Sequence, residues 1–178
     1  MSVDRIANAR LRDRVVSAEA AAALIQPGET VAMSGFTGSG YPKAVPVELA
    51  RRIESVHAQG LPFQISLMTG ASTAPELDGA LAKADGIAMR MPFQSDPDAR
   101  NRINEGKLDY IDIHLSHVAQ HVWFGFYGEI DTAVIEVSAI REDGSLVPST
   151  SVGNNKTWLD LATTVLVEGN ECQPAGGD

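Results

Sequence analysis

The sequence predicts an α/β protein with a mainly parallel sheet flanked by helices, and three observations support this fold class. Short apolar runs alternate with segments of helical spacing, which is typical of right-handed βαβ crossovers. Polar loops rich in small residues follow the predicted strands. The composition, 44% hydrophobic and 21% charged over 178 residues, suits one globular domain with a full core.

The alternation is clearest around one glycine-rich loop. Thr30–Met33 is predicted as a buried strand and Val45–Ala58 as an amphipathic helix, with Ser34–Pro42 (SGFTGSGYP) between them. Glycines at positions 35, 38 and 40 let a ligand approach the backbone closely. A loop between a strand and a helix N-terminus directs N–H groups at an anion. The spacing matches neither the dinucleotide fingerprint nor the P-loop, so an anion site and a tight crossover turn without ligand both stay open.

The other elements follow the same alternation. Arg10–Arg14 is predicted as part of an N-terminal helix or arm, and Ser17 as the N-cap of a helix over Ala18–Ile25. Further strands are predicted at Phe63–Met68, Ile87–Met91, Tyr110–Ile113, Thr132–Val137 and Thr164–Val167. Further helices are predicted at Pro75–Lys83, from a cap at Asp96 or Asp98 through Arg102, at Leu115–Trp123 and at Thr157–Ala162. A turn is predicted at Glu142–Gly144.

Four polar loops follow predicted strands, at residues 34–42, 69–73, 92–95 and 149–155. In open α/β sheets, ligands bind outside the carboxyl ends of the strands. We therefore expect the four loops to line one crevice at one edge of the sheet. This convergence favours the ligand-site interpretation of the first loop over a plain turn.

Charge and composition exclude several functional classes. The net charge of −9 opposes long-range attraction to nucleic acid or an anionic membrane, but local N–H groups and a lysine still suit a small phosphate-bearing ligand. No apolar run is long enough to predict a membrane span. Asp4 and Asp13 argue against a transit peptide, so we expect a cytoplasmic protein. The single cysteine, Cys172, excludes an internal disulfide, and its polar surroundings argue against a nucleophile.

Five segments carry a family resemblance. They are SGFTGSGYPKAVP at 34–46, ISLMTGASTAPELDGALAKADG at 65–86, RNRINEG at 100–106, HLS at 114–116 and REDGSLVPSTSVGNNKTWLDLA at 141–162. Together they resemble the N-terminal domain of the acetyl-CoA hydrolase/transferase family, close to succinyl-CoA:acetate CoA-transferases. The resemblance implies a CoA-transferase-type α/β domain, one of two similar halves with the active site between them. It divides the chain into an arm at 1–16, the family domain at 17–171 and a divergent tail at 172–178.

The resemblance also implies the chemistry. It implies an enzyme acting on acyl-CoA and small carboxylates, with coenzyme A thioester as substrate and neither cofactor nor metal. The family nucleophile is a glutamate of the C-terminal half, which forms an acyl-glutamyl anhydride and then a glutamyl thioester with CoA. Glu168 and Glu171 do not match that motif, so no catalytic residue is assigned in this chain.

Alone, the chain is expected to be inactive. It is interpreted as a truncated product, an isolated domain or one piece of a split enzyme. The missing C-terminal half, or a second copy, is the expected partner, and an uncovered apolar patch is expected to cause self-association. A catalytically inactive module that binds acyl groups or a partner is the alternative. A second, less favoured alternative is a phosphate-binding α/β protein outside the family.

The resemblance places substrate-binding positions in three of the loops. They are Gly35, Phe36, Thr37, Gly38, Gly40, Thr69, Gly70, Ser151, Gly153 and Asn154. The N–H groups near Phe36, Thr37 and Gly38 are expected to donate to a developing oxyanion, and one such donor is typically worth about 2.7–4 kcal/mol. For Asn154 and Asn155, capping of the following helix is preferred over donation to a carboxylate.

Two other clusters are given structural interpretations. His114, His117 and His121 share one helical face, but partly exposed or core histidines are preferred to a zinc site. Asp109, Asp112 and Asp131 suggest paired carboxylates for acid/base chemistry, but turn positions are preferred.

Overall fold

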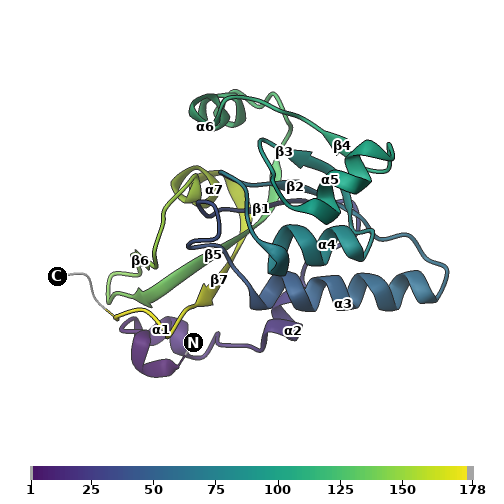
Figure 1. Ribbon diagram of the computed structural model, residues 1–178. Helices are drawn as coiled ribbons and strands as arrows, with labels where there is room; N and C mark the ends of the chain where they lie inside the picture. Colours follow the sequence, from purple (N-terminus) through teal and green to yellow (C-terminus); the bar gives the residue numbers. More distant parts are fainter. Residues whose placement is uncertain (1, 176–178) are drawn as a thin grey trace.

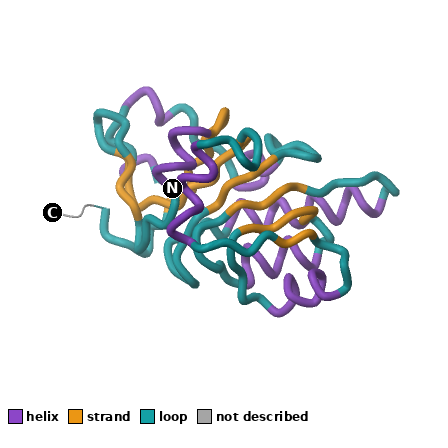
Figure 2. The backbone as a smooth tube through the Cα atoms, turned by 90° about the horizontal axis from the view of Figure 1, so that it is seen from above, coloured by secondary structure: helices purple, strands orange, loops and turns teal. Residues whose placement is uncertain are grey.

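The computed structural model describes residues 2–175, in which seven strands form one sheet with helices on both faces (Figures 1 and 2). The strands are β1 Thr30–Met33, β2 Ile65–Met68, β3 Ile87–Met91, β4 Asp109–Tyr110, β5 Ile130–Ile140, β6 Leu146–Pro148 and β7 Ala162–Gly169. The α-helices are α1 Ala9–Arg12, α2 Ala18–Ala22, α3 Ala44–Ala58, α4 Ala80–Lys83, α5 Pro97–Asn104, α6 Leu115–Trp123 and α7 Asn155–Leu161. A 3-10 turn covers Val3–Arg5, and a π-helical turn at Pro75–Gly79 leads into α4.

The strand order confirms the predicted parallel α/β fold. The sheet runs β4-β3-β2-β1-β5-β6, and β7 also pairs with β5. All pairs are parallel except that of β5 with β6. Because β1 and β7 pair with the same stretch of β5, at residues 132–134, they must lie on its two opposite edges.

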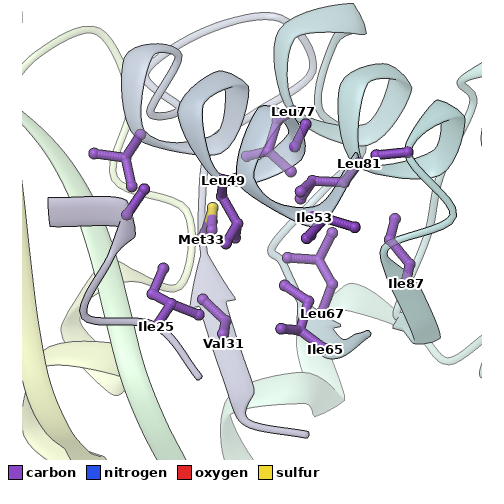
Figure 3. Packing of buried hydrophobic residues seen from close by; sticks show 14 of the residues in the cluster. Ile25, Val31, Met33, Leu49, Ile53, Ile65, Leu67, Leu77, Leu81 and Ile87 are labelled. Carbon is purple, nitrogen blue, oxygen red and sulfur yellow. The ribbon is translucent and has the colours of Figure 1, made fainter. Parts of the chain in front are cut away.

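Two hydrophobic clusters bury the two faces of the sheet. Successive side chains of a strand point to opposite faces, so Val31 and Met33 lie in one cluster and Ala32 in the other. Leu49 and Ile53 of α3 pack on the first face, where Figure 3 shows them above the strand residues. The α6 and α7 helices cover the second face, in line with the continuous apolar runs of doubly covered parallel strands.

Helix boundaries follow the predicted caps. The Ser17 Oγ accepts a hydrogen bond from Ala20 N at 3.1 Å, which confirms Ser17 as the N-cap of α2. Asp96 rather than Asp98 caps α5, because its Oδ1 accepts from Asp98 N and Ala99 N at 2.9 and 3.1 Å.

One predicted strand needs correction, and one observed strand was not predicted. The predicted strand at Tyr110–Ile113 is paired only at Asp109–Tyr110, since Ile111 and Ile113 turn away into the second hydrophobic cluster. The sequence did not indicate β6, because Pro148 and the turn before it obscure the strand pattern. Pro148 is tolerated at the end of β6 because that strand lies at the end of the strand order.

Several other boundaries differ by a few residues. The α2 helix stops at Ala22 instead of Ile25, α7 begins at Asn155 instead of Thr157, and β7 extends from Ala162 to Gly169. None of the helices described between residues 2 and 175 has the length and hydropathy of a membrane span. Residues 176–178 of the predicted tail lie outside the described residues.

Truncating a core side chain of α3 tests the first cluster. Leu49 is fully buried, so Leu49→Ala is expected to lower the free energy of unfolding by about 2–5 kcal/mol in urea denaturation, through lost burial and a residual cavity. The matched control is Leu61→Ala, at a position that is 56% exposed, with an expected change within about 0.5 kcal/mol. Equal effects of the two changes would contradict this packing.

Candidate functional site

The glycine-rich loop lies where the strand order reverses. The chain moves outward from β1 through β2 and β3 to β4, and then returns to place β5 on the other side of β1. Ligands of open α/β sheets bind at such a reversal, outside the carboxyl ends of the strands. We call this end of the sheet, with the loops at 34–42, 69–73, 92–95 and 149–155, the carboxyl edge.

Contacts between loops confirm that the four loops come together. Ser34 Oγ accepts from Asn154 N at 2.8 Å, and Ser151 Oγ donates to Ser39 O at 2.7 Å. On the other side, Ser72 Oγ accepts from Ser95 N at 2.9 Å. The loop at 149–155 follows the antiparallel strand β6, yet it still reaches this edge because β5 extends beyond the end of β1.

Glycines, which have no Cβ atom, make this close approach of the loops possible. A Cβ on Gly40 would lie 2.7 Å from Ser151 N, and Gly40 has a φ of +67°. A Cβ on Gly70 would lie 2.7 Å from Ser34 Oγ, and one on Gly35 would lie 2.6 Å from the Tyr41 Cβ. These glycines are required by loop packing, which is a structural reason for their presence that does not depend on a ligand.

The tip of the first loop is different, because it faces solvent. A Cβ on Gly38 would meet nothing within 4 Å. Phe36 N donates to Ser39 O at 2.8 Å, so this N–H is engaged within the loop, and its expected donation to an oxyanion stays a prediction. Thr37 and Gly38 are exposed, and Thr37 has a φ of +50°. Their two N–H groups are the donors of this tip that can reach a ligand.

The N-terminus of α3 is already occupied by a carboxylate of the chain itself. Glu168 of β7 accepts from Lys43 N at 2.6 Å and Ala44 N at 2.9 Å through Oε1, and from Val45 N at 2.8 Å through Oε2. The free N–H groups of a helix start attract an anion, and Glu168 supplies that anion internally. The sequence-based expectation of an external anion at this helix start is therefore corrected.

Lys43 is also turned inward. Its Nζ lies 2.5 Å from Glu136 Oε2 and 2.8 Å from Tyr41 O, and 4.1 Å from the centroid of the Tyr41 ring. Glu136 is almost fully buried, and its Oε1 also accepts from Ser149 Oγ at 2.5 Å and from Asn170 Nδ2 at 3.2 Å. Lys43 therefore neutralises a buried carboxylate instead of presenting a charge to a phosphate.

Tyr41 closes the base of the same loop. Its hydroxyl donates to Glu76 Oε2 at 2.8 Å. Burial, and then the hydrogen bond and negative charge of Glu76, raise the pKa of Tyr41 well above its usual value. Tyr41 is consequently a neutral hydrogen-bond donor and not a base.

A buried ion pair fixes the second and third loops. Arg90 Nε and Nη2 donate to the two Asp78 oxygens at 2.7 and 2.9 Å, and both side chains are fully buried. Arg90 also donates to Phe93 O, and Thr73 donates to Asp78 through N and Oγ1 at 3.1 and 2.7 Å. Burial alone would raise the pKa of Asp78, but the charge and hydrogen bonds of Arg90, together with Thr73, lower it.

The remaining predicted positions differ in burial and in their hydrogen bonds. Thr69 is fully buried and its hydroxyl donates to Ala71 O at 2.8 Å, so its side chain serves the loop. Neither asparagine caps α7 as expected: Asn154 makes no side-chain cap bond, and the buried Asn155 Oδ1 has no partner among the described residues. The role of the ten predicted positions in substrate binding stays a prediction.

The histidine and aspartate clusters lie outside the contacts between the four loops of the carboxyl edge. His114 is at the N-cap position of α6 and His117 and His121 lie within the helix, with successive ring centroids 5.6 and 5.9 Å apart. Within residues 2–175 no group of three His, Cys, Asp or Glu side chains is placed to hold a metal ion. Asp131 Oδ2 accepts from Thr30 N at 2.8 Å, which is a structural contact at the start of β1.

Comparison with known proteins gives a consistent result. The model of the acetyl-CoA hydrolase/transferase N-terminal domain matches residues 2–176. The chain is 44% identical over 170 residues to a succinyl-CoA:acetate CoA-transferase of Clostridium kluyveri, covering 96% of this chain and 31% of the relative. It is 36% identical over 178 residues to an acetyl-CoA hydrolase of Schizosaccharomyces pombe, covering 96% of this chain and 34% of the relative. The chain thus spans about a third of the length of these relatives.

Solved structures share the fold at low sequence identity. RipA from Yersinia pestis superimposes with a TM-score of 0.69 at 19% identity, over 98% of this chain and 40% of that one. Glutaconate coenzyme A-transferase from Acidaminococcus fermentans gives a TM-score of 0.64 at 13% identity, over 86% of this chain and 68% of that one. These similarities support the fold alone.

Two glycines of the first loop should respond differently to a methyl group. Gly40→Ala is expected to lower the free energy of unfolding by about 1–3 kcal/mol, because it adds a Cβ at a positive φ against the Ser151 backbone. Gly38→Ala is the matched control and should change stability by less than about 0.5 kcal/mol, since its Cβ would meet no neighbour. Thermal and urea unfolding measure both, and a Gly38 effect as large as that of Gly40 would contradict the loop packing.

Removing the charge of Asp78 should destabilise the protein strongly. Asp78→Asn leaves Arg90 buried without a counter-charge, which typically costs about 3–5 kcal/mol of unfolding free energy at pH 7. Asp98→Asn is the control, because Asp98 makes an exposed pair with Lys83 at 3.3 Å, worth about 1 kcal/mol or less.

The pH dependence gives a second readout of the same pair. The pKa of Asp78 is below its ordinary value of 3.8, so the contribution of ionised Asp78 to the free energy of unfolding is fully present above pH 3.8. That contribution is lost as the pH falls through the lowered folded-state pKa. The gap in unfolding free energy between the native chain and Asp78→Asn should therefore narrow below pH 3.8. A constant gap down to pH 3 would refute the assignment.

Proposed function

The chain belongs to the acetyl-CoA hydrolase/transferase family through its N-terminal domain, and from this membership we propose what its carboxyl edge does. We propose that this domain supplies one wall of the active site of an acyl-CoA:carboxylate CoA-transferase or an acetyl-CoA hydrolase. The observation that carries the proposal is the convergence of four loops at the strand-order reversal, with free donors at the tip of the first loop.

The proposed role of the loop tip is to bind the acyl or carboxylate end of the substrate. Thr37 and Gly38 are exposed, and their N–H groups make no hydrogen bond among the described residues, on a loop whose base is held by Tyr41 and Ser151. A donor that is already in place when charge develops on an acyl oxygen costs no reorganisation during reaction. The rigid base and exposed tip together suit this preorganised role.

The nucleophile is proposed to come from outside these residues. The three glutamates in contact with the first loop and the start of α3 are all engaged: Glu76 by Tyr41, Glu136 by Lys43, and Glu168 by the α3 backbone. A carboxylate whose oxygens already accept hydrogen bonds is poorly placed to attack a thioester. This supports a family-type glutamate contributed by the part of the protein that the longer relatives contain.

The coenzyme is proposed to lie mainly against that same absent part, entering as a thioester substrate and not as a resident cofactor. On this chain, the cationic elements nearest the loop are already neutralised, since Lys43 pairs with Glu136 and the start of α3 binds Glu168. Exposed apolar side chains cap three of the loops at this edge: Phe36 at 56%, Phe93 at 44% and Val152 at 49% exposure. Such side chains suit a covering surface better than a phosphate site.

Thiol release from acetyl-CoA and succinyl-CoA tests the proposal. The purified chain alone, with or without acetate, is expected to show no turnover above buffer. Mixing it with the C-terminal two-thirds of a relative is expected to produce thiol. Cys172 is exposed and would react with a thiol reagent, so Cys172→Ser serves as the assay background.

The outcomes separate the two candidate roles. Turnover by the chain alone would place a nucleophile within these residues and overturn the assignment to the absent part. Binding of the C-terminal part without turnover would favour the inactive binding module. Acceleration by acetate would favour transfer over hydrolysis.

A further inference from the structure

A separate cleft lies between the N-terminal arm and β7. It has a volume of about 400 Å³ and is lined by arm residues, by the first residues of α3 and by the second half of β7. None of the residues of the four loops at the carboxyl edge lines it. This site is therefore distinct from the one proposed above, and the inference does not rest on the proposed function.

The walls of the cleft are mainly aliphatic and are open to solvent. Val15 and Val16 of the arm are 43% and 59% exposed, and Val165 of β7 is 39% exposed. Leu11 contributes to the arm side, and Ile140 contributes from the end of β5. Among the described residues β7 pairs with β5 alone, so the other edge of β7 is unpaired beside the cleft. An apolar lining of this kind favours a ligand with a hydrocarbon chain.

One cation lies at this lining without a partner. Arg5 is bound to backbone oxygens of Ser138, Glu171 and Gln173, and Arg12 donates to Ile6 O at 2.8 Å. Arg14, by contrast, is exposed and lines the cleft, and its guanidinium makes no hydrogen bond or ion pair among the described residues, although its backbone N donates to Leu11 O at 3.1 Å. Arg14 is therefore available to pair with an anion, and a guanidinium binds a carboxylate with two parallel hydrogen bonds.

The acidic group of the lining does not cancel this charge. Glu168 is the other ionisable residue that faces the cleft, and both of its oxygens accept N–H groups at the start of α3. The N–H groups at the start of α3 thus offset the negative charge of Glu168. The positive charge of Arg14 keeps no carboxylate partner at the cleft, although the net charge of the protein is −9.

We propose that this cleft binds a medium-chain monocarboxylate. The hydrocarbon chain lies against Val15, Val16 and Val165, and the carboxylate pairs with Arg14. Small-molecule sites usually have volumes of about 300–1,000 Å³, so a cleft near the lower limit suits a chain of about ten carbons and is too small for a whole CoA ester.

Decanoate binding to the full 178-residue chain tests the proposal, measured by calorimetry and by NMR shifts of the valine methyl groups. Lengthening the ligand from hexanoate to decanoate should strengthen binding about threefold to fourfold per methylene until the cleft is full. Decanol, which lacks the carboxylate, should bind at least about tenfold more weakly.

Two variants and one matched control locate the site. Arg14→Gln should weaken decanoate binding about tenfold or more while leaving decanol unchanged. Val165→Asp should abolish binding of both ligands, because it places a charge on the apolar wall. Arg10→Gln is the control, since Arg10 is an exposed arginine of the same arm that does not line the cleft, and it should have no effect.

Three results of the binding measurements would overturn the proposal, and so would one pattern of methyl shifts. These are no decanoate binding at millimolar concentration, equal binding of decanoate and decanol, or equal effects of Arg14→Gln and Arg10→Gln. Methyl shifts confined to Phe36, Phe93 or Val152 neighbours would likewise contradict it, because they would assign the ligand to the carboxyl edge.

Discussion

The pairing of β5 with three other strands determines where the glycine-rich loop, the loop after β6 and the end of β7 lie. β5 places β1 on one side and β7 on the other, and its last residues pair with β6 beyond the end of β1. Glu136, near the middle of β5, then binds groups from three separate segments: Lys43, Ser149 and Asn170. A single buried strand with one buried carboxylate thus connects the glycine-rich loop, the loop after β6 and the end of β7.

At the carboxyl edge, the groups that would attract an anion are already paired with carboxylates of the same domain. The start of α3 and the ammonium of Lys43 would both attract an anion if they were free, but Glu168 and Glu136 already occupy them. The glycine-rich loop therefore differs from a phosphate-binding loop in that its helix start and its lysine already have carboxylate partners, although its strand-loop-helix order is the same. Thr37 and Gly38, whose N–H groups make no hydrogen bond among the described residues, are exposed at the tip.

Local patterns were sufficient for the sheet and for the gathering of the loops. β1 and β3 have the predicted bounds, and Ser17 caps α2 as expected, because these features depend on neighbouring residues. The short strand β6 was missed, since Pro148 and turn residues leave too little strand pattern. The Asp78–Arg90 pair and the Glu168 cap were also missed. Their partners lie 12 and more than 120 residues apart, and no local pattern reports such contacts.

The cap on α3 has a consequence for the order of assembly during synthesis. The helix begins at Ala44, but the carboxylate that satisfies its first N–H groups belongs to residue 168. On the ribosome, β1 to β4 and α3 emerge before β5 and β7, so β1 keeps an open edge and α3 an uncapped start until residue 168 has been synthesised. The contacts that Ser151 and Glu168 make with the glycine-rich loop and the start of α3 therefore form only after nearly the whole domain has emerged.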